Sequence, residues 1–138
     1  MATPRAGKRG GSAAKTALRD FHPIVRRWFT DTLGTPSAPQ QAGWPAIASG
    51  ENALILAPTG TGKTLAAFLW AIDRLSTTPA PADDKKRLRV LYVSPLKSLT
   101  YDVERNLRSP LAGIQLEAQR TGTNVTPLRV STRTGDTD

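Results

Sequence analysis

Apolar residues recur every three or four positions in several stretches of the chain, which is the spacing of one face of an α-helix. The first stretch is His22–Leu33, and Gly34 and Pro36 end it. A second, shorter helix is predicted over Ala38–Ser49, with Gly50 as its C-terminal cap. The first third of the chain is therefore predicted to contain two short helices.

Two later stretches have the same helical period. Lys63–Leu75 places its apolar residues on one face, and so does Leu96–Leu107. Pro110–Gln119 is predicted to continue as a further helix. The polar, proline-rich segment Ser76–Arg87 is a connector between two of these regions.

Short, continuous apolar runs alternate with the later helices. These runs are Ala53–Ala57, Leu88–Val93 and Leu128–Thr132, and they are typical of strands that are buried on both faces. Connections that contain a helix imply parallel strands with helices on the faces of the sheet. The sequence therefore predicts an α/β fold in which a parallel sheet is covered by helices on both faces.

Charge and composition add a basic tail to this picture. Residues 1–20 are rich in Gly, Ala, Lys and Arg without periodicity, so we expect a disordered tail before a domain formed by residues 21–138. The 138-residue chain has 19 Lys and Arg against 11 Asp and Glu, a net charge of +8. This balance favours polyanions such as nucleic acid as partners, although a solvated tail that only aids solubility would give the same charge.

Composition also excludes several classes of site. The chain contains no cysteine, so it has no disulfide and no thiolate metal site. No stretch approaches the roughly 18 apolar residues that a membrane span requires. We therefore expect no membrane partner and a cytoplasmic location.

The most specific local motif, APTGTGKT, lies between the first predicted strand and the helix that follows it, at Ala57–Thr64. Its glycines let backbone N–H groups surround phosphate oxygens, and the helix N-terminus adds positive potential. Lys63 can reach the β- and γ-phosphates of a nucleoside triphosphate, and the Thr64 hydroxyl can join a Mg²⁺ shell, so both are candidate catalytic residues. The predicted phosphate-binding residues are Thr59, Gly60, Thr61, Gly62, Lys63 and Thr64.

Four segments together are more specific than the phosphate loop alone. They read APTGTGKTLAAFLWAIDRL (57–75), RVLYVSPLKSL (89–99), DVERNLRSPLAGI (102–114) and RTGDT (133–137). In combination they resemble the Lhr-type (large helicase-related) superfamily-2 helicases of the DEAD/DEAH-box class. This resemblance implies an ATP-driven helicase or translocase that acts on DNA or RNA–DNA duplexes and is linked to DNA repair. Residues 21–138 would then be the N-terminal part of the first of two RecA-like P-loop NTPase domains.

The resemblance also implies a role for Gln40, which is similar to the glutamine of the helicase Q motif. Its amide has a donor and an acceptor, so it can recognise both groups on the edge of adenine. With Mg²⁺ at Thr64, the expected cofactors are ATP and Mg²⁺. The alternative reading of Gln40 is an ordinary surface residue at the start of a helix.

Two further segments resemble the parts of a helicase that touch nucleic acid. SPLKSL supplies Ser94 and Lys97, and RTGDT supplies Arg133 and Thr134. Each pair follows the end of a predicted strand, where ligands of α/β proteins usually bind. A single DNA strand is the expected partner, with an RNA–DNA hybrid as a further possibility and the remainder of a helicase chain as a protein partner. An ordinary strand–helix turn is the alternative for these residues.

One part of a helicase ATPase does not appear in the sequence. After Thr64, neither predicted strand ends in the Asp-Glu pair that holds Mg²⁺ and orients water. We therefore expect the chain to bind ATP and nucleic acid but not to hydrolyse ATP alone. The alternative function is a non-catalytic nucleotide- or nucleic-acid-binding remnant or a truncated gene product.

Overall fold

The structure is a computed structural model that describes residues 16–137. Most of the predicted tail lies outside the described residues. From Thr16 to Asp20 the chain forms a helical turn in which Ala17 and Leu18 are buried. Residues 16–20, which were predicted to belong to the tail, therefore include buried helical residues.

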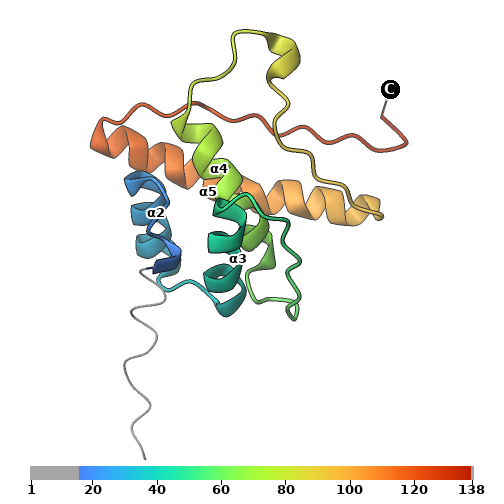
Figure 1. Ribbon diagram of the computed structural model, residues 1–138. Coiled ribbons are helices and arrows are strands. Elements are labelled where there is room, and N and C mark those ends of the chain that lie inside the picture. The colour runs from blue at the N-terminus through green and yellow to red at the C-terminus, as the bar shows by residue number, and fades with distance from the viewer. Residues whose placement is uncertain (1–15, 138) are drawn as a thin grey trace, which may run out of the picture. The chain divides into compact units, whose positions relative to one another are not determined.

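The regular elements of the described chain are helical (Figure 1). They are α2 (Pro23–Leu33), α3 (Ala38–Ala48), α4 (Lys63–Thr77), the short 3-10 helix η1 (Asp84–Lys86) and α5 (Lys97–Thr121). The first three agree with the predicted helices. None of the helices within residues 16–137 combines the length and apolar character needed to cross a membrane.

The ends of α2 and α3 follow from glycine. Gly34 has a φ of 78°, and its N–H bonds to the carbonyls of Phe29 and Thr30 at the end of α2. Gly50 has a φ of 81° directly after the last turn of α3, and its N–H bonds to the Ile47 carbonyl at 3.1 Å. Glycine adopts this left-handed conformation without the steric cost that a side chain brings. Both predicted helix ends are confirmed.

The prediction of two separate helices on either side of Pro110 is wrong, because α5 runs through the proline as one helix of 25 residues. A proline in a helix removes the hydrogen bond to the carbonyl four residues earlier, here that of Asn106. Pro110 is buried on the same face as Leu107 and Ile114. Packing of this face therefore compensates for the missing bond.

The three predicted strands do not form a sheet in the described part of the chain. Residues 53–57, 88–93 and 128–132 are irregular segments with no strand assigned to them. Most of their large apolar side chains are exposed, up to 85% for Leu54. A strand is defined by hydrogen bonds to a neighbouring strand, and an apolar run alone supplies no such partner. The predicted sheet therefore remains outside what this structure shows.

The chain divides into two compact units, residues 1–70 and residues 71–138. In the first unit, three aromatic rings form the centre of the core. The ring centroids of Phe21 and Phe29 lie 5.0 Å and 5.3 Å from that of Trp44, in both cases edge to face. Trp44 is 1% exposed. This ring cluster fixes α3, which carries Trp44, within the unit.

One face of α3 contacts the segment that contains the phosphate loop. The buried residues of α3 are Gln40, Gly43 and Trp44, at the spacing of one helical face. Gly43 faces Ile55, so closely that a Cβ atom would lie 2.9 Å from the Ile55 side chain. The Trp44 indole N–H donates to the Leu65 carbonyl at 3.2 Å. Helix α3 therefore supports the chain on both sides of the loop.

The second unit is organised by α5. Its buried face contains Leu107, Ile114 and Ala118. The segment after α5 returns toward the end of α4, where the Thr126 N–H donates to the Ser76 carbonyl at 2.8 Å. This return brings the C-terminal segment alongside α5.

Candidate functional site

The loop at 57–64 has the backbone shape that a phosphate loop requires. Gly60 and Gly62 have φ values of 78° and 83°, a region that side chains rarely adopt. The Thr61 hydroxyl donates to the Pro58 carbonyl at 2.6 Å and closes the turn. Helix α4 begins at Lys63, so its unpaired N–H groups lie directly after the glycines. The prediction that this loop lies at the N-terminus of a helix is confirmed.

The Lys63 side chain folds back across the loop. Its Nζ donates a hydrogen bond to the carbonyl of Ala57, the first residue of the motif. A phosphate ligand would compete with this carbonyl for the ammonium group. Thr64, the second predicted catalytic residue, is half-buried in the first turn of α4.

Gln40 lies beside the phosphate loop, but its amide is engaged within the protein. The side-chain oxygen accepts a hydrogen bond from the Ser37 N–H at 2.9 Å, and Nε2 donates to the Gly62 carbonyl at 3.2 Å. The residue is 5% exposed. Recognition of adenine would require the amide to give up these contacts or to use its remaining donor and acceptor positions. The structure thus gives Gln40 a contact that sequence reasoning missed.

The contact with Gln40 also constrains Gly62. A Cβ atom at this position would lie 2.5 Å from Gln40 Nε2, closer than real contacts allow. The C=O and N–H of one trans peptide point in opposite directions. Because Gln40 holds the Gly62 carbonyl, the N–H of Lys63 points away from α3. The Ala66 N–H also donates to the Gly62 carbonyl, at 3.0 Å, so Gln40 and the first turn of α4 together fix the orientation of a backbone donor in the loop.

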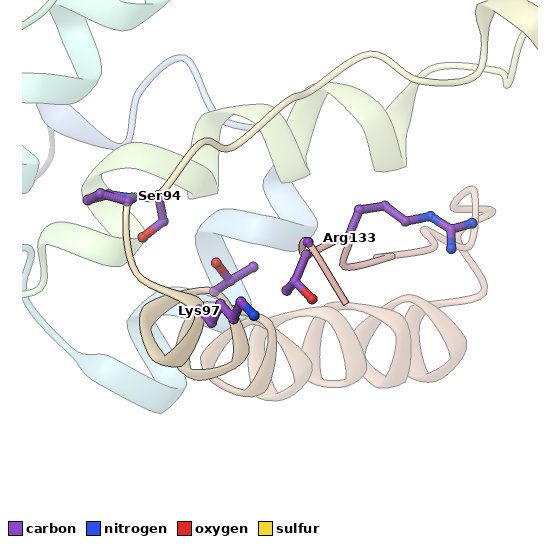
Figure 2. A pocket seen from close by; sticks show the side chains of 7 residues that line it. Ser94, Lys97 and Arg133 are labelled. Carbon is purple, nitrogen blue, oxygen red and sulfur yellow. The ribbon is translucent and has the colours of Figure 1, made fainter. Parts of the chain in front are cut away.

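The second unit contains an open recess of about 480 Å³ between the start of α5 and the C-terminal segment (Figure 2). The four residues predicted to touch nucleic acid all line it, although they come from segments far apart in the sequence. The full lining is Ser94, Pro95, Lys97, Thr100, Arg133, Thr134 and Gly135.

Figure 2 shows Lys97 at the start of α5, Ser94 on the segment that leads into this helix, and Arg133 on the C-terminal segment. The Lys97 ammonium forms an ion pair with the Asp136 carboxylate, and both side chains are mostly exposed. The Arg133 side chain extends away from Lys97. The Thr134 N–H donates to the Thr137 hydroxyl at 2.9 Å, which closes a turn at this edge of the recess. The recess thus combines two cations with hydroxyl groups.

Sequence reasoning overlooked two acidic residues in this region. Asp136 is part of RTGDT, so its proximity to Lys97 follows once the two segments are placed together. Glu104 is part of DVERNL, and its carboxylate accepts a hydrogen bond from the Thr132 hydroxyl at 2.6 Å. No local pattern predicts this contact between residues that are distant in sequence. Asp136 contacts a residue that lines the recess, and Glu104 contacts the residue that precedes Arg133.

Comparison with known proteins identifies the family. The profile of the DEAD/DEAH box helicase family matches residues 37–134. The "Lhr helicase/ probable uracil glycosylase" of Mycolicibacterium smegmatis is 52% identical over 120 residues, which are 87% of this chain and 8% of that protein. The "Lhr helicase/uracil glycosylase" of Escherichia coli is 48% identical over 121 residues, 85% of this chain and 8% of that protein. The chain therefore spans a small part of the length of these curated relatives.

A solved structure resembles the described chain closely. It is that of the Mycobacterium smegmatis helicase Lhr bound to ssDNA and AMP-PNP, with a TM-score of 0.79 and 49% identity. The match covers 88% of this chain and 15% of the other. The two share a fold, in agreement with the predicted RecA-like class. The chain belongs to the DEAD/DEAH box helicase family and is of the Lhr type.

Proposed function

We propose that this chain is a segment of an ATP-dependent helicase that binds ATP at the loop 57–64 and single-stranded nucleic acid at the recess of the second unit. The observation that carries this function is the convergence of Ser94, Lys97, Arg133 and Thr134 on one recess. These residues were predicted from two separate segments, and a turn without function gives no reason for them to meet. The ligands of the related M. smegmatis structure, ssDNA and AMP-PNP, support both halves of the proposal.

At the nucleotide site, the backbone N–H groups after Gly60 and Gly62 would contact the phosphates. Lys63 would exchange its bond to the Ala57 carbonyl for the β- and γ-phosphates. Mg²⁺ would arrive with the triphosphate, because Thr64 offers a single hydroxyl ligand and Mg²⁺ keeps several waters. Thr59 and Thr61 would complete the wall of the loop. Gln40 would act first as a support for the Gly62 carbonyl, and adenine recognition would use its remaining hydrogen-bonding groups.

The exposed apolar segments support the proposed sheet. Residues 53–57, 88–93 and 128–132 expose large apolar side chains that soluble domains normally bury. In a RecA-like domain these segments would pair as parallel strands between layers of helices. Such pairing would place the phosphate loop and both sides of the recess at the carboxyl ends of strands, where α/β proteins bind ligands.

The recess suits a phosphate backbone better than a base edge. Lys97 and Arg133 supply positive charge, and Ser94 and Thr134 supply hydroxyl donors. Contacts of this kind position a strand without reading its sequence. We propose single-stranded DNA as the ligand, with an RNA–DNA hybrid as a second substrate of the longer helicase. Unwinding and DNA repair would require the parts of the relatives that this chain does not match.

Replacing Lys97 with glutamine is expected to weaken binding of single-stranded DNA about three- to tenfold, because one phosphate contact is lost. The loss should be similar for oligo(dT) and for a mixed sequence, since the contact does not read bases. Fluorescence anisotropy with labelled oligonucleotides at fixed salt measures both affinities. The matched control is Lys86→Gln, which removes the same charge from the exposed helix η1. An equal loss of affinity in Lys97→Gln and Lys86→Gln would mean that only the net charge of the chain affects binding, and not the position of Lys97 in the recess.

Replacing Asp136 with asparagine is expected to tighten binding of the same oligonucleotide by about two- to fivefold, which corresponds to the strength of an exposed ion pair. In the free protein the Asp136 carboxylate is paired with the Lys97 ammonium group. A phosphate must therefore displace this carboxylate before it can contact Lys97. The gain should shrink when Lys97→Gln is also present. Weaker binding by Asp136→Asn would mean instead that the carboxylate holds Lys97 in its binding position.

A further inference from the structure

A side-chain hydrogen bond links α5 to the C-terminal segment next to the lining of the recess. Glu104, in the first half of α5, accepts this bond from the Thr132 hydroxyl at 2.6 Å. Arg108, on the next turn of the helix, donates to the other carboxylate oxygen at 3.2 Å. Thr132 directly precedes Arg133 and Thr134, which line the recess. The bond therefore joins α5 to the side of the recess that lies on the C-terminal segment.

We propose that Glu104 is a positioning residue for nucleic-acid binding: by holding Thr132 on α5, it presents Arg133 and Thr134 opposite Lys97. This inference rests on the proposed function of the recess. Glu104 does not touch the ligand in this scheme, since its carboxylate is directed to Thr132 and Arg108 rather than to the lining of the recess.

The Glu104–Thr132 bond is better placed to act as an anchor than the other link across the recess. That other link is the ion pair between Lys97 and Asp136, whose side chains are 57% and 75% exposed. The Glu104 side chain is 26% exposed. A hydrogen bond to a carboxylate is stronger than a neutral one, and reduced exposure protects it from competition by water. Phosphate can thus displace Asp136 while Thr132 stays in place.

The carboxylate remains ionised under the conditions of a binding experiment. The hydrogen bond from Thr132, and after it the Arg108 guanidinium, lower the pKa of Glu104 below its ordinary value of 4.5. A lowered pKa means that the anchor is fully present above the pKa of the unfolded chain. It is lost only as the pH falls through the lower, folded value. Binding measured near neutral pH therefore reports on the intact anchor.

The direction in which the loss of Glu104 changes nucleic-acid affinity distinguishes a positioning role from a simple electrostatic effect. Glu104 is an acidic residue near a site that binds phosphate, so removal of its charge alone should tighten binding. Removal of the anchor should instead weaken binding, because Arg133 and Thr134 lose their fixed position. A contact that must be ordered again on binding lowers the affinity.

The test compares Glu104→Ala, Thr132→Val and the double variant by anisotropy with oligo(dT). Each single variant should bind about three- to tenfold more weakly, and the double variant should be no weaker than the worse single one. Glu104→Gln keeps an oxygen that can accept from Thr132, so it should recover part of the affinity. The matched control, Asp102→Ala, removes an exposed acid of the same helix and should bind with equal or higher affinity.

Several results would overturn the proposal. These are tighter binding by Glu104→Ala, unchanged binding by Thr132→Val, or losses that simply add in the double variant. Thr132→Val keeps the side-chain shape and changes no charge, so it carries the test if Glu104→Ala lowers the thermal stability. If Lys97→Gln also leaves binding unchanged, the recess is not the nucleic-acid site and the proposed function itself fails. If Lys97→Gln weakens binding but Thr132→Val does not, only the positioning role is wrong.

Discussion

Replacing Lys63 with alanine is expected to lower the affinity for Mg-ATP by about a hundredfold, close to 3 kcal/mol. The lysine is the side chain of the loop that can carry positive charge to the β- and γ-phosphates. In the described structure its ammonium group donates a hydrogen bond to the Ala57 carbonyl, which a phosphate would replace as the acceptor. Titration with a fluorescent ATP analogue measures the loss.

The control for this result is Lys86→Ala, which removes an exposed lysine outside the loop. It should leave nucleotide affinity within about twofold of the original value, since isolated surface charges contribute little. Circular dichroism of Lys63→Ala should show the helical content of the unchanged chain. Nucleotide affinity that survives in a folded Lys63→Ala variant would contradict the assignment of the loop.

Replacing Gly62 with alanine is the second change with a large expected effect, a loss of nucleotide affinity of tenfold or more. Its φ of 83° costs about 1 to 2 kcal/mol for a residue with a side chain. The new Cβ would also lie 2.5 Å from Gln40 Nε2, so the Gln40 side chain would have to leave the Gly62 carbonyl or the loop would have to move. Both effects would displace the backbone N–H groups that we propose as phosphate contacts.

Gly50 offers a matched control for the strain at Gly62. Its φ is 81°, and a Cβ at this position meets nothing within 4 Å. Gly50→Ala should therefore lower thermal stability by a similar strain energy but leave nucleotide affinity unchanged. Equal nucleotide affinities of Gly50→Ala and Gly62→Ala would argue against a special role for the loop geometry.

The helices were largely predictable because their information is local. The apolar period and the terminal glycines gave α2, α3 and α4 within a few residues. The break expected at Pro110 failed for a physical reason: a local rule about one missing hydrogen bond cannot weigh the burial of a whole helical face. Tertiary packing decides such cases.

Only the parts of the site that are contiguous in the sequence could be predicted. The phosphate loop is a single run of residues, so its position and the need for Gly60 and Gly62 followed from the sequence. The partners of Gln40 and Glu104 lie 22 and 28 residues away, and no spacing rule places them. A glutamine that resembles an adenine reader therefore proved to contact the backbone of the loop.

The predicted strands show a second limit of prediction from sequence. Apolar runs such as Leu88–Val93 indicate that a segment suits a buried strand, but they do not say which segment pairs with it. The described chain leaves such segments exposed and without ladders. Likeness to a helicase of known structure supports the fold class, whereas the pairing of these segments remains a proposal.

The central claim, that the loop at 57–64 binds nucleotide through its phosphates, is tested most directly by calorimetric titration of the chain with ATP and with AMP in the presence of Mg²⁺. In the proposed binding mode Lys63 would reach the β- and γ-phosphates, and the loop backbone would contact the β-phosphate as well as the first phosphate. We therefore expect ATP to bind at least about tenfold more tightly than AMP, because several charge-assisted contacts depend on the added phosphates. Equal affinities for the two nucleotides, or no binding of ATP by the folded chain, would contradict the account.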